Sequence, residues 1–237
     1  MKHNIGLVGC GNWGQVIIKE IIKNKKFILK GIVCNSNTKL IKNSKIKIYD
    51  NYKSLISDKN ISCLYVAKDP EINFLIFKNL KKNIPVIFEK PITKNFKQAL
   101  MIYNLSLKKN ICMMTNLPNI YSDTFNETKN FIEKNIQNIH KIKIIDGNYG
   151  PFRKEMHPVL DWGVHPLTYI IKIFGSNQIH KISHQFLKKN YKTNTFLSKF
   201  NVQTKNNIDI SISTGNILKK KIRLLKIFLK DGNIFSN

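Results

Sequence analysis

The sequence predicts an α/β fold, with an N-terminal doubly wound parallel sheet followed by a smaller α+β domain whose sheet is mostly antiparallel. Over residues 1–117, apolar strand-like runs alternate with helix-like stretches of roughly 10–15 residues, a rhythm typical of βαβ units. Beyond that point, consecutive strand-like segments of alternating polarity follow one another, which favours antiparallel pairing. We therefore expect one domain over 1–117 and a second over 118–237, without a long linker between them.

The apolar pattern places each element of the first domain. Residues 3–11 form an apolar run that ends in glycines, as a buried parallel strand does, and residues 14–24 carry isoleucines on one helical face. A short strand, a turn and a helix share residues 45–57. The remaining strands are expected at 27–35, 61–67, 84–91 and 111–116, and the remaining helices at 72–83 and 96–110.

The second domain begins with a helix over 122–135 and a strand over 140–149. A polar loop then leads to an apolar helix over 159–174. The last strands are expected at 180–189, 195–204, 207–215 and 221–235.

The charge of the chain is strongly positive, with a formal net charge of +26 from 40 basic and 14 acidic residues. Only Arg153 and Arg223 are arginine, so 38 of the 40 basic residues are lysine (40 − 2). Nucleic-acid recognition usually favours the planar fork of arginine, and lysine here accompanies abundant isoleucine and asparagine, which A/T-rich codons encode. We expect no nucleic-acid partner, although the charge should draw anionic small molecules nearer.

Cys10, Cys34, Cys63 and Cys112 are widely spaced and form no C-x-x-C pair, which argues against a disulfide scaffold or a metal site. Free thiols in a reducing compartment fit better. No apolar run is long enough for a membrane span, and a strand begins too early for a signal peptide. The expected location is the cytoplasm, with no membrane partner.

Gly9, Gly11 and Gly14 fall in G-x-G-x-x-G spacing between a strand and a helix, with a second strand after the helix. In that setting the first glycine permits a tight turn, the second lets the backbone approach a pyrophosphate, and the third lets helix and strand pack closely. The helix N-terminus adds free N–H groups and partial positive charge. The loop therefore predicts a dinucleotide site; the alternative is a glycine turn that holds no nucleotide.

The acidic residue that usually binds the ribose hydroxyls is absent at the end of the second strand, where Asn35 and Ser36 stand. Without a carboxylate a 2′-phosphate is not repelled, and Lys39 is close enough in sequence to reach one. The cofactor is NAD or NADP, and this position slightly favours NADP.

Two further motifs lie where ligands bind in such folds. Glu89, Lys90 and Pro91 end a strand at the carboxyl edge of the sheet, where a lysine can point into the cleft; a surface turn is the alternative. Asp161 and His165 are four residues apart, so they share a face if the segment is helical, and a carboxylate can raise the pKa of an imidazole and orient it for proton transfer. The alternative reading makes Asp161 a helix N-cap.

Together "GLVGCGNWG" (6–14), "FEKP" (88–91) and "DWGVHPLTY" (161–169) make the chain resemble the glucose–fructose oxidoreductase/inositol dehydrogenase/rhizopine-catabolism (Gfo/Idh/MocA) family. The resemblance covers nearly the whole chain. It implies a Rossmann domain, an E-K-P tripeptide and a D-x-x-x-H pair in an α+β domain. "YVAKDPEIN" (65–73) departs from the family's V-A-T-P-x-x-x-H loop, because Lys68 and Asp69 replace Thr-Pro and Asn73 replaces the histidine.

The resemblance implies hydride transfer between a nicotinamide and a hydroxyl- or carbonyl-bearing carbon of a sugar, cyclitol or sugar-derived substrate. His165 is then the proton acceptor or donor, Lys90 polarises the substrate oxygen, and Asp161 positions the substrate or the histidine. Arg153 is a further expected substrate contact, from a loop that also holds Lys154 and His157. The expected cofactor-binding residues are Gly9, Gly11, Asn12, Trp13, Gly14, Asn35, Ser36, Ala67, Lys68, Glu89 and Lys90.

The second domain is short for this family, whose members run well past 300 residues, so the substrate-binding part is reduced. A homo-oligomer is a further expectation. The altered 65–73 loop leaves open a second function, that of a catalytically inactive dinucleotide-binding relative with a regulatory or partner-binding role.

Overall fold

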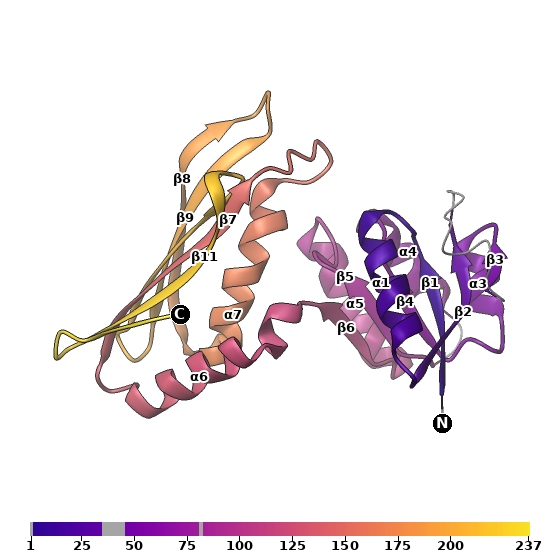
Figure 1. Ribbon diagram of the computed structural model, residues 1–237, viewed down its shortest axis with the longest axis horizontal. Helices are drawn as coiled ribbons and strands as arrows, with labels where there is room; N and C mark the ends of the chain where they lie inside the picture. The colour runs from indigo at the N-terminus through magenta and orange to yellow at the C-terminus, as the bar shows by residue number, and fades with distance from the viewer. Residues whose placement is uncertain (1, 35–45, 81–82) are drawn as a thin grey trace. The chain divides into compact units, whose positions relative to one another are not determined.

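The computed structural model describes residues 2–34, 46–80 and 83–237. The chain divides into two compact units, Met1–Asn116 and Leu117–Asn237 (Figure 1). Each unit has its own sheet. Asn35, Ser36 and Lys39 lie outside the described residues.

The first unit is built on a six-stranded sheet in the order β3-β2-β1-β4-β5-β6, with every described pair parallel. The order reverses between β1 and β4, which places the switch point at the glycine loop that follows β1. The strands are β1 His3–Val8, β2 Phe27–Val33, β3 Lys47–Tyr49, β4 Cys63–Val66, β5 Val86–Glu89 and β6 Met113–Asn116. The doubly wound sheet predicted from the sequence is confirmed.

Helices lie on both faces of this sheet. Helix α1 (Asn12–Lys23) buries Ile18 and Ile21 against one face, where they meet Leu7 and Ile32. The opposite face forms the larger core, around Phe77 and Phe88. The helices on that side are α3 (Tyr52–Ser57), α4 (Glu71–Asn79) and α5 (Phe96–Lys109).

The second unit has a six-stranded sheet in the order β12-β11-β7-β10-β9-β8. All its pairs are antiparallel except β10 with β7, so the mostly antiparallel sheet is also confirmed. Helices α6 (Asp123–Asn135) and α7 (Val164–Phe174) cover one face (Figure 1). The other elements are η1 Pro118–Tyr121, β7 Ile139–Tyr149, η2 Val159–Gly163, η3 Ser176–Gln178, β8 Ile179–Asn190, β9 Thr195–Thr204, β10 Asp209–Gly215, β11 Ile217–Leu229 and β12 Ile234–Ser236.

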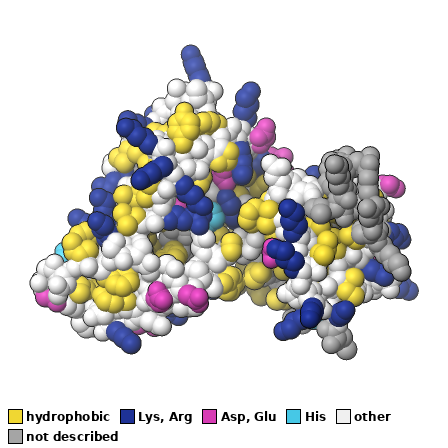
Figure 2. Space-filling model, in the orientation of Figure 1, with side chains coloured by type: hydrophobic (Ala, Val, Ile, Leu, Met, Phe, Trp, Pro, Cys, Tyr) yellow, Lys and Arg dark blue, Asp and Glu magenta, His cyan; other side chains and the backbone are white. Residues whose placement is uncertain are grey.

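Alternation along β9, β10 and the second half of β11 separates two faces of different chemistry. Residues such as Ile142, Ile210 and Ile227 are buried under the helices. Their neighbours point to the other face, which we call the lysine face. It carries Lys141, Lys143, Lys181, Lys199 and Lys226. Elsewhere, lysine and arginine side chains are scattered among apolar and neutral ones rather than gathered in one patch of the visible surface (Figure 2).

One sequence expectation is wrong. Cys10 and Cys34 are joined in a disulfide rather than being free thiols, because β1 and β2 run side by side in register and bring the two Cα atoms to 5.4 Å. The expected helix over 159–174 is present, and its first turn, η2, is π-helical before α7 begins. Pro166 has no N–H to donate and its ring crowds the preceding turn, which accounts for the widened register there. Among the described residues, no helix is both long enough and apolar enough to span a bilayer.

Candidate active site

The three glycines of the 9–14 loop are held in three different ways. Gly9 has φ +100°, and a side chain there would overlap the Ala67 carbonyl at the end of β4. A Cβ on Gly14 would lie 2.5 Å from the carbonyl oxygen of Gly9, so α1 can approach the strand only with glycine at this position. Both residues are needed by the fold itself.

Gly11 is different, because a Cβ there would meet no described atom within 4 Å. Its backbone is extended (φ −62°, ψ −172°), a conformation open to any residue, so the fold does not require glycine here. Gly11 is also the N-cap of α1, and no side chain among the described residues caps that helix end. The arrangement fits a dinucleotide, since the open Cα and uncapped N–H groups suit a pyrophosphate at the helix N-terminus.

Glu89, at the end of β5, gathers residues from the neighbouring strands. Its Oε1 accepts hydrogen bonds from Trp13 Nε1 (2.5 Å), Tyr65 OH (2.5 Å) and Asn116 Nδ2 (2.8 Å). Asn116 also donates to the Tyr65 hydroxyl at 2.8 Å. Burial, followed by the hydrogen bond to Glu89, raises the pKa of Tyr65, so its phenol stays protonated and donating.

This cluster fixes Trp13 in relation to the carboxyl ends of β4, β5 and β6. Glu89 Oε2 makes no hydrogen bond in the part of the chain described, which leaves it available to a ligand. Tyr65 and Asn116 were missed by sequence reasoning. The available signal was their position, since both stand at strand ends of a parallel sheet.

Lys90 follows β5 and is half-buried, and its peptide bond to Pro91 is cis. The segment after it is tied to the first turn of α4. Asn73 is 1% exposed, and its Nδ2 donates to the Ile92 carbonyl at 2.8 Å. Asn73 stands where the family pattern has histidine, and here it positions the segment beside Lys90.

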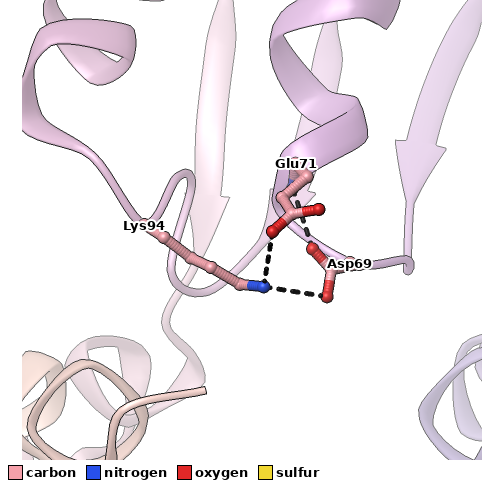
Figure 3. Close-up of polar contacts among 3 residues, drawn as sticks. All are labelled: Asp69, Glu71 and Lys94. Atoms are coloured by element: carbon pink, nitrogen blue, oxygen red, sulfur yellow. Dashed lines mark hydrogen bonds and ion pairs between the residues drawn. The ribbon is translucent and has the colours of Figure 1, made fainter. Parts of the chain in front are cut away.

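A second tie joins the same segment to the start of α4 (Figure 3). Lys94 Nζ donates to Asp69 Oδ2 at 3.2 Å and to Glu71 Oε1 at 3.0 Å. Asp69 also accepts from the Glu71 backbone N–H at the start of α4, at 3.0 Å. Partial burial lowers the pKa of Lys94, but the hydrogen bonds to both carboxylates outweigh it and raise the pKa overall. Lys68, beside this clamp, is exposed.

In the second unit, Asp161 lies within η2 and is 6% exposed. Arg153 Nη1 donates to its Oδ1 at 3.2 Å. Two of the residues expected at the substrate, Arg153 and Asp161, are therefore brought together as an ion pair. The expected N-cap role does not apply, because Asp161 is inside the turn rather than at its start.

The loop before η2 is anchored from the turn between β8 and β9. Asn194 Nδ2 donates to the carbonyls of Arg153 and Met156, at 2.5 and 3.0 Å. His157 Nδ1 accepts from the Val159 N–H, the first residue of η2, at 3.2 Å. Burial, together with the charge of His184, lowers the pKa of His157 and favours this neutral, accepting form.

His165, on the first turn of α7, lines a cavity of about 310 Å³ that lies entirely within the second unit. Arg223 of β11 and Asp146 of β7 line the same cavity, as does Asn119 of η1. Arg223 and Asp146 are partners in the strand register and form an ion pair, Nε to Oδ1, of 3.6 Å. Sequence reasoning missed Arg223, Asp146 and Asn119, which come from segments far apart in the chain.

The expected site residues thus fall into two sets. Gly9, Gly11, Asn12, Trp13, Gly14, Ala67, Lys68, Glu89 and Lys90 lie in the first unit, around the carboxyl ends of its strands. Arg153, Asp161 and His165 lie in the second unit.

Residues 3–117 match the model of an oxidoreductase family described as having an NAD-binding Rossmann fold, the Gfo/Idh/MocA family. The match spans 115 of the 237 residues, so it shows the similarity of the N-terminal unit to this family. No curated protein matches the sequence.

Solved structures resemble the whole chain in fold. A myo-inositol dehydrogenase from Corynebacterium glutamicum has a TM-score of 0.85 at 14% identity, and the match covers 100% of this chain and 75% of that one. For a scyllo-inositol dehydrogenase from Lactobacillus casei, the TM-score is 0.83 at 14% identity, with the same coverage. Biliverdin reductase from Synechocystis, solved with biliverdin and NADP+, gives 0.77 at 16% identity, over 99% of this chain and 79% of that one. The Gfo/Idh/MocA resemblance is confirmed over residues 3–117 by the family model, and the solved structures show that the fold extends over the whole chain.

Proposed function

We propose that this Gfo/Idh/MocA chain is a dehydrogenase or reductase that uses NAD or NADP on a sugar, cyclitol or sugar-derived substrate. The observation that carries the proposal is Gly11, a glycine the fold does not need, at the uncapped N-terminus of α1. The close approach of a dinucleotide pyrophosphate to the backbone would explain why position 11 is a glycine. The inositol dehydrogenases among the similar structures support a cyclitol-like substrate, and the absence of an acid at Asn35 favours NADP.

When bound, the nicotinamide supplies or accepts the hydride. The protein's own contribution is proton transfer and orientation. His165 takes the proton from the substrate hydroxyl in oxidation and returns it to the carbonyl in reduction. Lys90 hydrogen-bonds and polarises the same oxygen. Asp161 forms an ion pair with Arg153 and holds that arginine toward the substrate. The same ion pair neutralises the buried carboxylate of Asp161 in η2, next to the start of α7.

Titration of the purified chain with NADH and with NADPH, followed by nicotinamide fluorescence, tests the cofactor assignment. We expect saturable binding, tighter for NADPH. If neither binds, the proposal fails. Turnover of a panel of cyclitols and sugars is then compared between the native chain, Lys90→Ala and His165→Ala. Both substitutions should reduce kcat by about 10²- to 10⁴-fold if the residues act in proton transfer.

A second candidate function is a binding protein that has lost catalysis. One observation favours it: the loop that replaces the family's T-P-x-x-x-H is committed to structural contacts, through Asp69 to Lys94 and through Asn73 to Ile92. Saturable cofactor binding with no turnover across the panel would support this candidate. Turnover that Lys90→Ala or His165→Ala abolishes would exclude it.

A further inference from the structure

The chain places its two arginines selectively. Among 40 basic residues only Arg153 and Arg223 are arginine. Among the described residues, the buried carboxylates are Asp146 and Asp161, at 7% and 6% exposed. Each arginine pairs with one of them. Lysine serves everywhere else, so these two positions need the geometry of guanidinium rather than its charge alone.

Arg223 is held from two sides. Nε faces Asp146 at 3.6 Å, and Nη1 donates to Asn119 Oδ1 at 3.1 Å. Nη2 makes no hydrogen bond to any residue that the structure describes. The side chain is still 45% exposed, so the guanidinium is oriented yet accessible. A guanidinium fixed in this way can offer its remaining N–H groups to a ligand without first losing much side-chain entropy.

The ligand space beside Arg223 is the cavity that also holds His165. Ile144, Pro166 and Leu225 are among the apolar residues of its wall. Besides Asp146, its polar lining comes from His165, Arg223, the amides of Asn119 and Asn237, and the hydroxyl-bearing Ser122, Thr124 and Tyr169. Asp146 adds the one carboxylate of the lining, and its charge is offset by Arg223 itself. The cavity therefore offers a proton-transfer group and an oriented cation to the same small molecule.

We infer that Arg223 is a carboxylate-binding residue, and that the substrate is a hydroxy acid or oxo acid related to a sugar, such as an aldonate or a uronate. The carboxylate binds the free edge of the guanidinium, whose fork matches its two oxygens. The hydroxyl or carbonyl carbon of the same molecule lies toward His165. This inference rests on the proposed function for the reaction, but the binding of the acid is a separate property of the second unit.

The test measures binding of acids and of their neutral counterparts to the full chain, with and without NADPH, by calorimetry. The probes are hexose uronates and aldonates and glycerate, each compared with the corresponding sugar or polyol. We expect the acids to bind more tightly than the neutral compounds. Arg223→Gln should weaken binding of the acid by about 10- to 100-fold, the range for a lost charged hydrogen bond, and leave the neutral compounds unaffected.

Three variants keep the result interpretable. Arg223→Lys retains the charge but not the fork, and should recover only part of the affinity. Asp146→Asn combined with Arg223→Gln avoids an unpaired buried carboxylate, so its folding can be checked by urea denaturation and its loss of acid binding read directly. Lys220→Gln removes a positive charge from an exposed position of the same strand that does not line the cavity, and should change nothing.

The inference is overturned if no acid binds more tightly than its neutral counterpart, or if the folded double variant still prefers acids. Failure of the proposed function is a different outcome, since it would appear as absence of NADH and NADPH binding. Acid binding by the chain without cofactor, lost in Arg223→Gln, supports the subsite even in that case.

Discussion

Substitutions at Gly11 and Gly14 should have different effects, one mainly on cofactor binding and the other mainly on folding. Gly11→Ala adds one methyl group at a position with extended backbone and no described atom within 4 Å. Gly14→Ala adds the same methyl group 2.5 Å from the Gly9 carbonyl oxygen and 3.0 Å from its carbon. The two substitutions are chemically identical and lie on the same loop, so each is the control for the other.

The magnitudes follow from these distances. An ordinary carbon contact begins near 3.4 Å, so Gly14→Ala is short by about 0.9 Å (3.4 − 2.5) against rigid backbone. Overpacking of this kind costs about 1–3 kcal/mol. Gly11→Ala disturbs no packing, so it should lower the free energy of unfolding by no more than about 1 kcal/mol, the cost of alanine at an N-cap. Its methyl group would stand where the pyrophosphate approaches, and a similar overlap there weakens binding by about 10- to 100-fold.

Urea denaturation measures the first quantity, and fluorescence titration with NADPH the second. We expect Gly11→Ala to unfold close to the native chain and to bind NADPH poorly, and Gly14→Ala to unfold at lower urea. Native affinity in Gly11→Ala would refute the assignment of Gly11 to the pyrophosphate. A urea midpoint in Gly11→Ala as low as in Gly14→Ala would show instead that the fold requires this glycine.

Three further predictions concern stability. Lys109 Nζ donates to the carbonyls of Phe77, Lys78 and Leu80 at the end of α4, at 2.8–3.2 Å, and burial lowers the pKa of Lys109. Lys109→Met should lower the free energy of unfolding by about 1.5–3 kcal/mol, measured by urea denaturation. An unchanged urea midpoint would contradict the role of Lys109 as a cap of α4. Cys34→Ser opens a disulfide with a sequence separation of 24, which the chain-entropy model values at about 3.5 kcal/mol. A fully reduced native chain should lose the same amount of stability, and an equal urea midpoint with and without dithiothreitol would count against the bond. Burial and the charge of His184 lower the pKa of His157 in the folded chain. Its contribution to the free energy of unfolding is therefore present above the unfolded pKa of about 6.5 and is lost as the pH falls below that value, which melting temperatures from pH 8 to 5 should show. His157→Asn, whose side chain can still accept from the Val159 N–H, should reduce this pH dependence.

Much of the fold could be predicted because it depends on local patterns. The run before Gly9, the isoleucine face of α1 and the alternation along β9 and β10 each specify burial within a few residues. The loss of helical regularity around Pro166 was missed, because a proline near a helix start is compatible with either an α-helical or a wider turn.

The candidate site was predictable only where a motif is contiguous. Gly11 and Lys90 stand in short motifs, whereas the partners that fix the site come from other elements. Glu89 meets Tyr65 and Asn116 because three parallel strands end at one edge, and Arg223 meets Asp146 because β11 and β7 pair in register. The bond between Cys10 and Cys34 has the same origin. The spacing of residues along the sequence does not identify partners that lie on neighbouring strands.

The lysine face bears on how copies of this chain can meet. Four of its five lysines, all except Lys226, line one hollow of this face together with Asp209, which is the register partner of Lys141. Two copies that stacked sheet on sheet would bring ten like charges (5 + 5) to within a few ångströms, well inside the screening length of about 10 Å at 0.1 M salt. At low ionic strength, electrostatic repulsion therefore opposes the stacking of two copies through the lysine face. Added salt or polyvalent anions should weaken this repulsion. Association of two copies through this sheet would therefore depend more strongly on the salt concentration than on the protein concentration.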